Sequence, residues 1–168
     1  MSKAREIRCF DYVNRPYDQV REALKADATG VFQGASKSAA SRARSVASEL
    51  RVNLGGVEVS ADISISVDRI EERAGDVTSP PTTRLQLEWE ASRSPRWFPI
   101  MRAEFSIYPL TATETQLDFL GRYEPPMGAI GGALDAVVGH RIAEASVHRF
   151  VSDVALYLRT KLATSGRE

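Results

Sequence analysis

Three titratable side chains interrupt an otherwise apolar segment near the end of the sequence. Arg141, Glu144 and His148 are spaced i, i+3 and i+7, so on a helix they lie along one face, within reach of one another. Of the three, only His148 has an unperturbed pKa near neutrality. A buried unpaired charge is costly, so the three must be paired, hydrated or exposed. Two interpretations follow: a surface ion cluster at the edge of the helix, or a polar island that lines a hydrated cavity and orients a ligand.

The segment that carries this trio is predicted to form one long helix over about 130–162. Residues seven apart lie within about 20° of each other on a helix, so each such line is nearly one seam. Two seams run along this segment and are apolar except at the trio. The first comprises Ile130, Val137, Glu144, Val151 and Leu158, and the second Leu134, Arg141, His148, Ala155 and Leu162. The apolar residues of the second half, from Val151 onward, are expected to be plain core.

Between residues 49 and 123 the hydrophobic period changes from that of a helix to two. Apolar and polar residues alternate through four runs, over 57–70, 83–91, 100–108 and 115–123. The pair Gly55-Gly56 precedes the first run and predicts a two-residue hairpin. Such alternation indicates an antiparallel sheet with one buried face and one solvated face. After the last run, Pro125-Pro126 ends the strand and the glycines at 128, 131 and 132 permit a reversal into the final helix.

The buried face of this sheet needs a cover. A strand over 7–13 precedes two short predicted helices, at about 14–26 and 35–50, and we expect both to be too small to cover the sheet. The final helix could extend roughly 45 to 50 Å, enough to cross it. The predicted fold is therefore α+β, a helix-grip in which a curved antiparallel sheet wraps a long C-terminal helix, with the order β-α-α-β run-α. The length suits a single domain over 1–168.

The predicted inward face also suggests a binding pocket, because small residues occur among bulky ones. Ala61, Ala91, Ala103 and Gly121 either let the helix approach closely or leave space. Ligand pockets are mostly apolar with a few polar groups. The candidate wall residues are Trp89, Met101, Ala103, Phe105, Phe119 and Tyr123. Tyr123 and His148 would be polar handles for a ligand.

Composition and motifs exclude several classes of function. Formal net charge is zero, which gives no support for a nucleic-acid partner or for attraction to an anionic membrane. No stretch is apolar enough for stable membrane insertion, and the first residues lack the apolar core of a signal peptide. One cysteine and two histidines cannot form a Cys/His-rich zinc site, and no cofactor motif is present. The lone Cys9 fits a reducing compartment, so we expect a cytoplasmic protein. From the missing motifs we expect no metal and no cofactor.

Both ends of the sequence resemble a known superfamily. The strand "IRCFDYV" running into "VNRPYDQVREAL" is similar to the strand–proline–helix start of START/Bet v 1-like (SRPBCC) domains. The segment "LDFLGRYEPPMGAIGGALDAVVGHRIAEASVHRFVSDVALYL" resembles the last strand and final helix of the bacterial polyketide cyclase/dehydrase and lipid-transport-like members. The resemblance implies a cavity between sheet and final helix that binds or transports an apolar small molecule, such as a lipid, a polyketide or an isoprenoid-like compound.

Two alternatives to a carrier remain open from the sequence. The first is a polyketide cyclase/dehydrase-type enzyme, in which Tyr123, Arg141, Glu144 or His148 would supply acid–base or orienting groups. The second is a protein-interaction domain without a ligand. Neither can be decided from the fold, because one fold hosts many functions.

Overall fold

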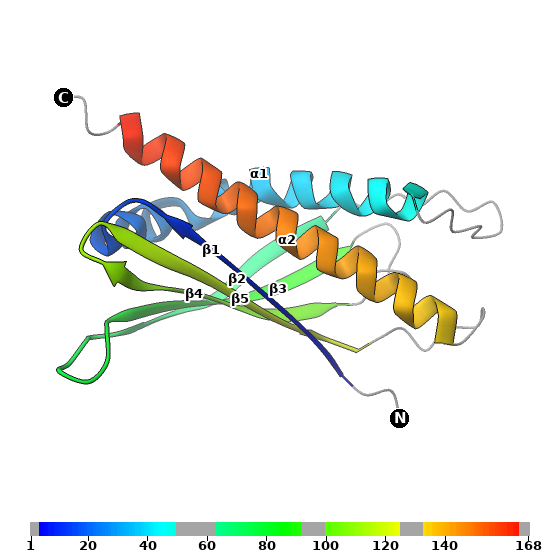
Figure 1. Cartoon of the computed structure of the whole chain (residues 1–168), viewed down its shortest axis with the longest axis horizontal. Coiled ribbons are helices and arrows are strands. Elements are labelled where there is room, and N and C mark those ends of the chain that lie inside the picture. The colour runs from blue at the N-terminus through cyan, green and yellow to red at the C-terminus, as the bar shows by residue number, and fades with distance from the viewer. Residues whose placement is uncertain (1–3, 50–62, 92–99, 125–132, 165–168) are drawn as a thin grey trace.

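The computed structural model describes residues 4–49, 63–91, 100–124 and 133–164. The elements are β1 (Arg5–Val13), α1 (Tyr17–Glu49), β2 (Ile63–Arg73), β3 (Thr82–Ala91), β4 (Met101–Thr111), β5 (Glu114–Tyr123) and α2 (Ala133–Thr164). The strands form one antiparallel sheet in the order β1-β5-β4-β3-β2. Both helices lie on the same face of this sheet (Figure 1). The predicted α+β helix-grip is confirmed.

Strands β3 to β5 follow the predicted alternation. Their register places Leu87 opposite Ala103, and Phe105 opposite Phe119, with all four side chains buried on the inner face. The intervening residues, such as Glu104, lie on the outer face. The first half of the run over 57–70, the Gly55-Gly56 hairpin, and the turn at 125–132 lie outside the described residues.

Helix α1 consists of two helical segments, as predicted, but the second segment starts earlier than predicted. Backbone angles at Asp27 depart from helical values (φ −155°, ψ 63°), and this kink divides α1 into two segments. The Asp27 carboxylate accepts a hydrogen bond from the Gly30 backbone N–H at 2.9 Å, as an N-cap does. The second segment therefore begins directly after Asp27, several residues before the predicted start at 35. Two glycines, at 30 and 34, hid the helical period there.

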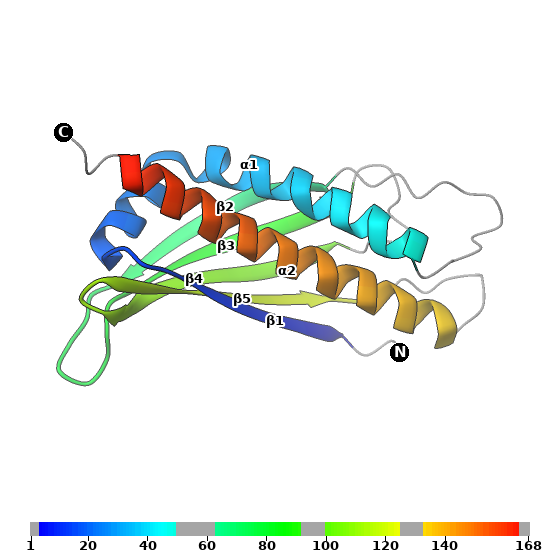
Figure 2. The same ribbon diagram turned by 45° about the horizontal axis from the view of Figure 1, so that its top comes forward.

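The expectation that the final helix alone covers the sheet is wrong. Figure 2 shows α1 lying over the β2 side of the sheet and α2 running beside it toward β5 and β1. Phe32 of α1 contacts Phe150 of α2 and Phe105 of β4, each with 5.6 Å between ring centroids. The core is therefore shared by both helices and the sheet. No helix in the described part of the chain is long and apolar enough to cross a bilayer.

Candidate functional site

The six predicted wall residues come together on the inner face of β3, β4 and β5. Strand register places Met101 between Trp89 of β3 and Tyr123 of β5. Ala103, Phe105 and Phe119 continue the same surface along β4 and β5. All six are buried. The sequence thus identified a continuous apolar surface, and whether a ligand contacts it stays a prediction.

The middle of the interface between sheet and α2 is filled by aromatic rings. Phe150 lies at its centre, with ring centroids 5.3 Å from Trp89 and 6.0 Å from Phe119. Trp89 and Phe119 are themselves in edge-to-face contact at 6.2 Å. Such pairs add stability beyond the area that they bury. This part of the interface is solid core, because Phe150 already occupies one side of Trp89 and of Phe119.

The space beside Gly121 is taken by a methionine. A Cβ built on Gly121 would collide with Sδ of Met101, which lies on the neighbouring strand. The glycine therefore makes room for the Met101 side chain, and its small size does not by itself leave an empty space. Methionine is unbranched and adapts its shape easily, so this stretch of wall is deformable.

A part-buried polar pair lies at the end of the apolar wall. The Tyr123 hydroxyl is 2.6 Å from Nδ1 of His140, which comes from the first half of α2. The two rings are stacked, with centroids 6.1 Å apart and an interplanar angle of 21°. His140 is half-buried and Tyr123 is 5% exposed. The structure thus gives the predicted handle Tyr123 a partner that the seam analysis missed, because His140 falls on neither seam.

Two charged residues surround this pair. Burial raises the pKa of Tyr123, the positive charge of Arg5 opposes that shift, and the negative charge of Glu144 adds to it. Arg5 also hydrogen-bonds to the tyrosine side chain. Because its pKa is raised, Tyr123 is a protonated phenol at neutral pH and can donate its hydrogen to an acceptor. The phenol donates to Nδ1 of His140 when the imidazole carries its proton on Nε2, and it accepts from Nδ1–H in the other tautomer.

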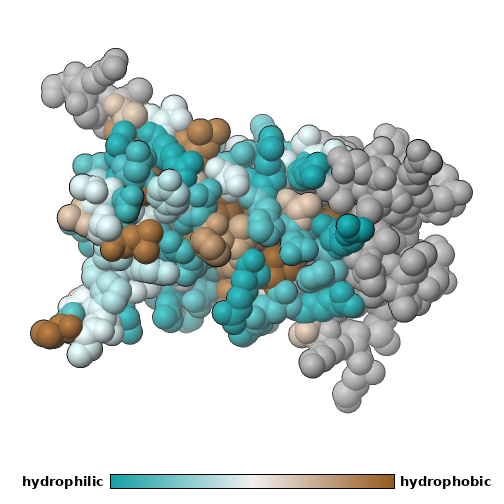
Figure 3. Space-filling view, viewed as in Figure 1, coloured by the Kyte–Doolittle hydropathy of each residue, from teal (hydrophilic) through white to brown (hydrophobic). Residues whose placement is uncertain are grey.

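The predicted trio of Arg141, Glu144 and His148 is exposed on α2. The described surface in this view is mostly hydrophilic, with scattered apolar residues (Figure 3). Glu144 is near enough to influence Tyr123, whereas His148 contacts a different residue farther along β1. The trio therefore does not act as one compact group, and its contact with a ligand stays a prediction.

His148 lies against the chain's one cysteine. Sγ of Cys9 is 3.5 Å from Nδ1 of His148. Burial, with a smaller contribution from the charge of Asp11, raises the pKa of Cys9 to about 11. The nucleophilic form of cysteine is the thiolate, which Cys9 does not form near neutral pH. The pair therefore forms a weak hydrogen bond without a thiolate, unlike the activated Cys–His pair of a thiol enzyme.

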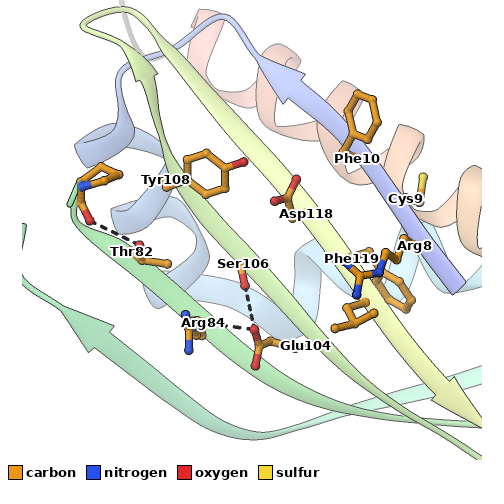
Figure 4. A pocket seen from close by; sticks show the side chains of 12 residues that line it. Arg8, Cys9, Phe10, Thr82, Arg84, Glu104, Ser106, Tyr108, Asp118 and Phe119 are labelled. Carbon is orange, nitrogen blue, oxygen red and sulfur yellow. Dashed lines mark hydrogen bonds and ion pairs between the residues drawn. The ribbon is translucent and has the colours of Figure 1, made fainter. Parts of the chain in front are cut away.

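A hollow of about 520 Å³ lies on the outer face of the sheet (Figure 4). Its polar side chains bond to one another: Glu104 accepts from Ser106 at 3.3 Å and pairs with Arg84 at 3.7 Å. Asp118 likewise accepts from Gln116 at 2.8 Å. Mutual pairing of this kind is expected on a solvated sheet face. The sequence pattern did not point to this surface as a binding site.

The described residues offer no metal centre, because no three His, Cys, Asp or Glu side chains among them come close enough to hold an ion. Tyr123 and His140 supply hydrogen-bonding groups beside the large apolar surface, and the hydroxyls of Tyr17 and Thr83, 2.6 Å apart, form a buried polar pair elsewhere in the core.

Comparisons with known proteins give structural likeness only. No protein-family model and no curated protein matches the sequence. Among solved structures, the chain is similar to TTHA0849 from Thermus thermophilus, with 14% sequence identity, a TM-score of 0.53, and coverage of 96% of this chain and 99% of that chain. It is also similar to the Zhui aromatase/cyclase from Streptomyces sp. R1128, with 13% identity, a TM-score of 0.54, and coverage of 98% and 99%.

At such low identity these likenesses establish the fold and carry no activity over to this chain. Both extend over nearly the full length of each protein. They agree with the sheet order and the long C-terminal helix described above. The chain therefore shares the helix-grip fold of these two proteins.

Proposed function

We propose that this protein binds or transports an apolar small molecule, of the lipid, polyketide or isoprenoid-like class, between the inner face of the sheet and α2. The observation that carries the proposal is the junction of an apolar wall with a part-buried polar pair, Tyr123 and His140. Small-molecule sites combine these two features, since the apolar surface supplies affinity and the few polar groups set orientation. The fold supports the same location, because the superfamily resemblance implies a cavity there.

The aromatic centre limits where such a ligand would lie. Phe150 already occupies the space beside Trp89 and Phe119. A ligand would therefore lie toward Ala103, Met101 and the tyrosine, with the aromatic rings as the floor of its site. Movement of the Met101 side chain would enlarge this space at little cost, since thioether chains repack easily.

A blocking substitution tests the proposal. We expect Ala103→Trp to weaken binding of the neutral dye N-phenylnaphthylamine at least tenfold, because the indole would fill the proposed space. Arg102→Trp is the matched control: it adds the same ring one residue away on the exposed outer face, and it should leave dye affinity unchanged. Dye fluorescence and melting temperature are measured for both variants and the wild type.

Two outcomes would contradict the proposal. Overpacking a solid core typically costs about 1–3 kcal/mol, so a large loss of stability in Ala103→Trp with unchanged dye affinity would show a filled core there. Failure of the wild type to bind any apolar probe, together with no co-purified ligand in native mass spectrometry, would favour a protein-interaction domain.

A cyclase/dehydrase-type enzyme is the second candidate, and the Tyr123–His140 hydrogen bond is what favours it. General acid–base chemistry needs a titratable group held within reach of the substrate, and such a pair can pass a proton. The test is to incubate the co-purified ligand with the wild type and with His140→Ala. Loss of water from the ligand only with the wild type would identify an enzyme, and an unchanged mass with both proteins would leave the carrier function.

A further inference from the structure

We propose that His140, with Tyr123 as its positioning residue, recognises an uncharged oxygen acceptor, a carbonyl or a hydroxyl group, on the apolar ligand. This inference rests on the function proposed above, and it deepens it by naming the ligand's polar group. It starts from the direction of one hydrogen bond and from the charges beside it.

The donor direction follows from the groups in contact. Tyr123 is buried, it receives a hydrogen bond from Arg5, and its own hydroxyl is 2.6 Å from Nδ1 of His140. A phenol that accepts from a guanidinium still has its own proton to donate. The three side chains therefore form a directed chain, from Arg5 through the phenol to the imidazole. Each donor in such a chain polarises the next one.

The chain ends on an N–H that has no protein acceptor in the described part of the structure. His140 makes one hydrogen bond there, through Nδ1. Its ring is half-buried at the end of the apolar wall, and its partner Tyr123 lies across the strand pair from Met101. With Tyr123 as the donor to Nδ1, the imidazole donates through Nε2, and in the proposed recognition this N–H donates to the ligand.

Charge decides which acceptor is favoured. The positive charge of Arg5 and the negative charge of Glu144 act on Tyr123 in opposite directions. The effect of Arg5 is the larger of the two, but its side chain already hydrogen-bonds to Tyr123, whereas Glu144 is on the same helix as His140, one turn later. An anionic head group would gain from Arg5 but be repelled by Glu144, whereas a carbonyl or hydroxyl oxygen accepts from the imidazole without either cost. Uncharged oxygen is therefore preferred over carboxylate.

Three ligands that share one apolar body test this preference. Naphthalene, acetylnaphthalene and naphthoate are each titrated against the bound N-phenylnaphthylamine dye. With the wild type we expect acetylnaphthalene to bind roughly three- to tenfold more tightly than naphthalene, the gain of one hydrogen bond, and naphthoate to bind less tightly than acetylnaphthalene.

Variants assign the gain to the pair. His140→Phe keeps a ring but removes the donor, so it should abolish the preference for acetylnaphthalene over naphthalene. Tyr123→Phe should weaken the preference. In that variant the ring-nitrogen NMR signals of His140 should also change from a single Nε2–H form to a mixture of tautomers, which a purely structural role would not produce. Tyr108→Phe, on the outer face of β4, is the control and should change neither.

The possible results distinguish a failure of this inference from a failure of the proposed binding function. If naphthalene displaces the dye but acetylnaphthalene binds no better, or if the preference survives in His140→Phe, the head-group assignment is overturned while apolar binding stands. If naphthoate binds most tightly, the charge argument is wrong. If none of the three ligands displaces the dye, both the inference and the proposed binding site are overturned.

Discussion

The interface between the sheet and α2 has two unlike regions. Its middle is built from aromatic rings of β3, β5 and α2, with Phe150 in contact with Trp89 and Phe119. Its end, where β1 begins and β5 ends, holds a hydrogen-bonded tyrosine and histidine near Arg5. Aromatic burial supplies folding free energy, whereas a part-buried polar pair contributes little net stability. The comparison separates the region that stabilises the fold from the region where we propose that a ligand is recognised.

The largest loss of stability should come from removing the whole of α2. Deleting residues 130–168 leaves the inner face of the sheet covered by α1 alone. We expect this truncated chain to lose cooperative unfolding, because the buried apolar surface of five strands would face water. Circular dichroism during heating measures it. Cooperative melting of a monomer near the wild-type temperature would show that α1 suffices as a cover.

The next largest effect tests the aromatic middle. Phe150→Ala should cost about 3–5 kcal/mol of unfolding free energy, since it removes a fully buried ring that contacts three others. Tyr157→Ala, which removes a partly exposed ring from the same helix, is the control and should cost much less. Urea titration gives both values. Equal losses would mean that the aromatic cluster is not the main stabilising region.

The buried thiol on β1 gives a prediction with a defined pH window. The pKa of Cys9 is raised from 9.0 to about 11 in the folded protein, so its thiolate population near pH 8 is about 100-fold below that of an unfolded chain. Alkylation by iodoacetamide at this pH should be slower by a similar factor until urea is added.

The sign of the linked stability change follows from the same shift. Above about pH 9 the unfolded thiol loses its proton while folded Cys9 keeps it, so stability should fall as pH rises from 9 toward 11. The Cys9→Ala variant should not show this fall in stability between about pH 9 and 11. Rapid alkylation of the native protein at pH 8 would contradict the buried thiol.

A smaller loss of unfolding free energy is expected at the polar end of the interface, where Tyr123 contacts His140. Tyr123→Phe removes one hydroxyl and should cost about 0.5–1.5 kcal/mol, well below the cost of Phe150→Ala. Urea titration of the two variants under the same conditions makes the comparison. A loss as large as that of Phe150→Ala would show that the pair at this end is chiefly structural.

The smallest effect is expected for the exposed trio. His148→Ala should change unfolding free energy by less than about 1 kcal/mol, because the side chain is exposed. If His148 nonetheless contacts the ligand, the same variant should weaken binding of acetylnaphthalene while leaving naphthalene unaffected. Unchanged affinity for both would place the binding determinants on the strands and on His140.

Period and chain order were sufficient to predict the parts of the fold that depend on local pattern. A strand has a side-chain period of two, so Phe105 and Phe119 could be assigned to one face before any neighbour was known. The seven-residue seams likewise placed Val151 and Leu158 in the core, and both are fully buried. The second segment of α1 was the exception, because its start depends on one capping carboxylate, Asp27, among glycines that obscured the pattern.

Only the tertiary structure decided how the helices and strands pack against one another. The sequence alone determined that Tyr123 points inward, since the alternation of β5 requires it. It could not pair Tyr123 with His140, because that contact depends on how α2 is rotated and translated over the sheet, a non-local property with no signal in either segment. The same rotation decided that Arg141, Glu144 and His148 are exposed, and that α1 shares the cover. Local periods specify the faces of elements, whereas packing between the elements specifies the site.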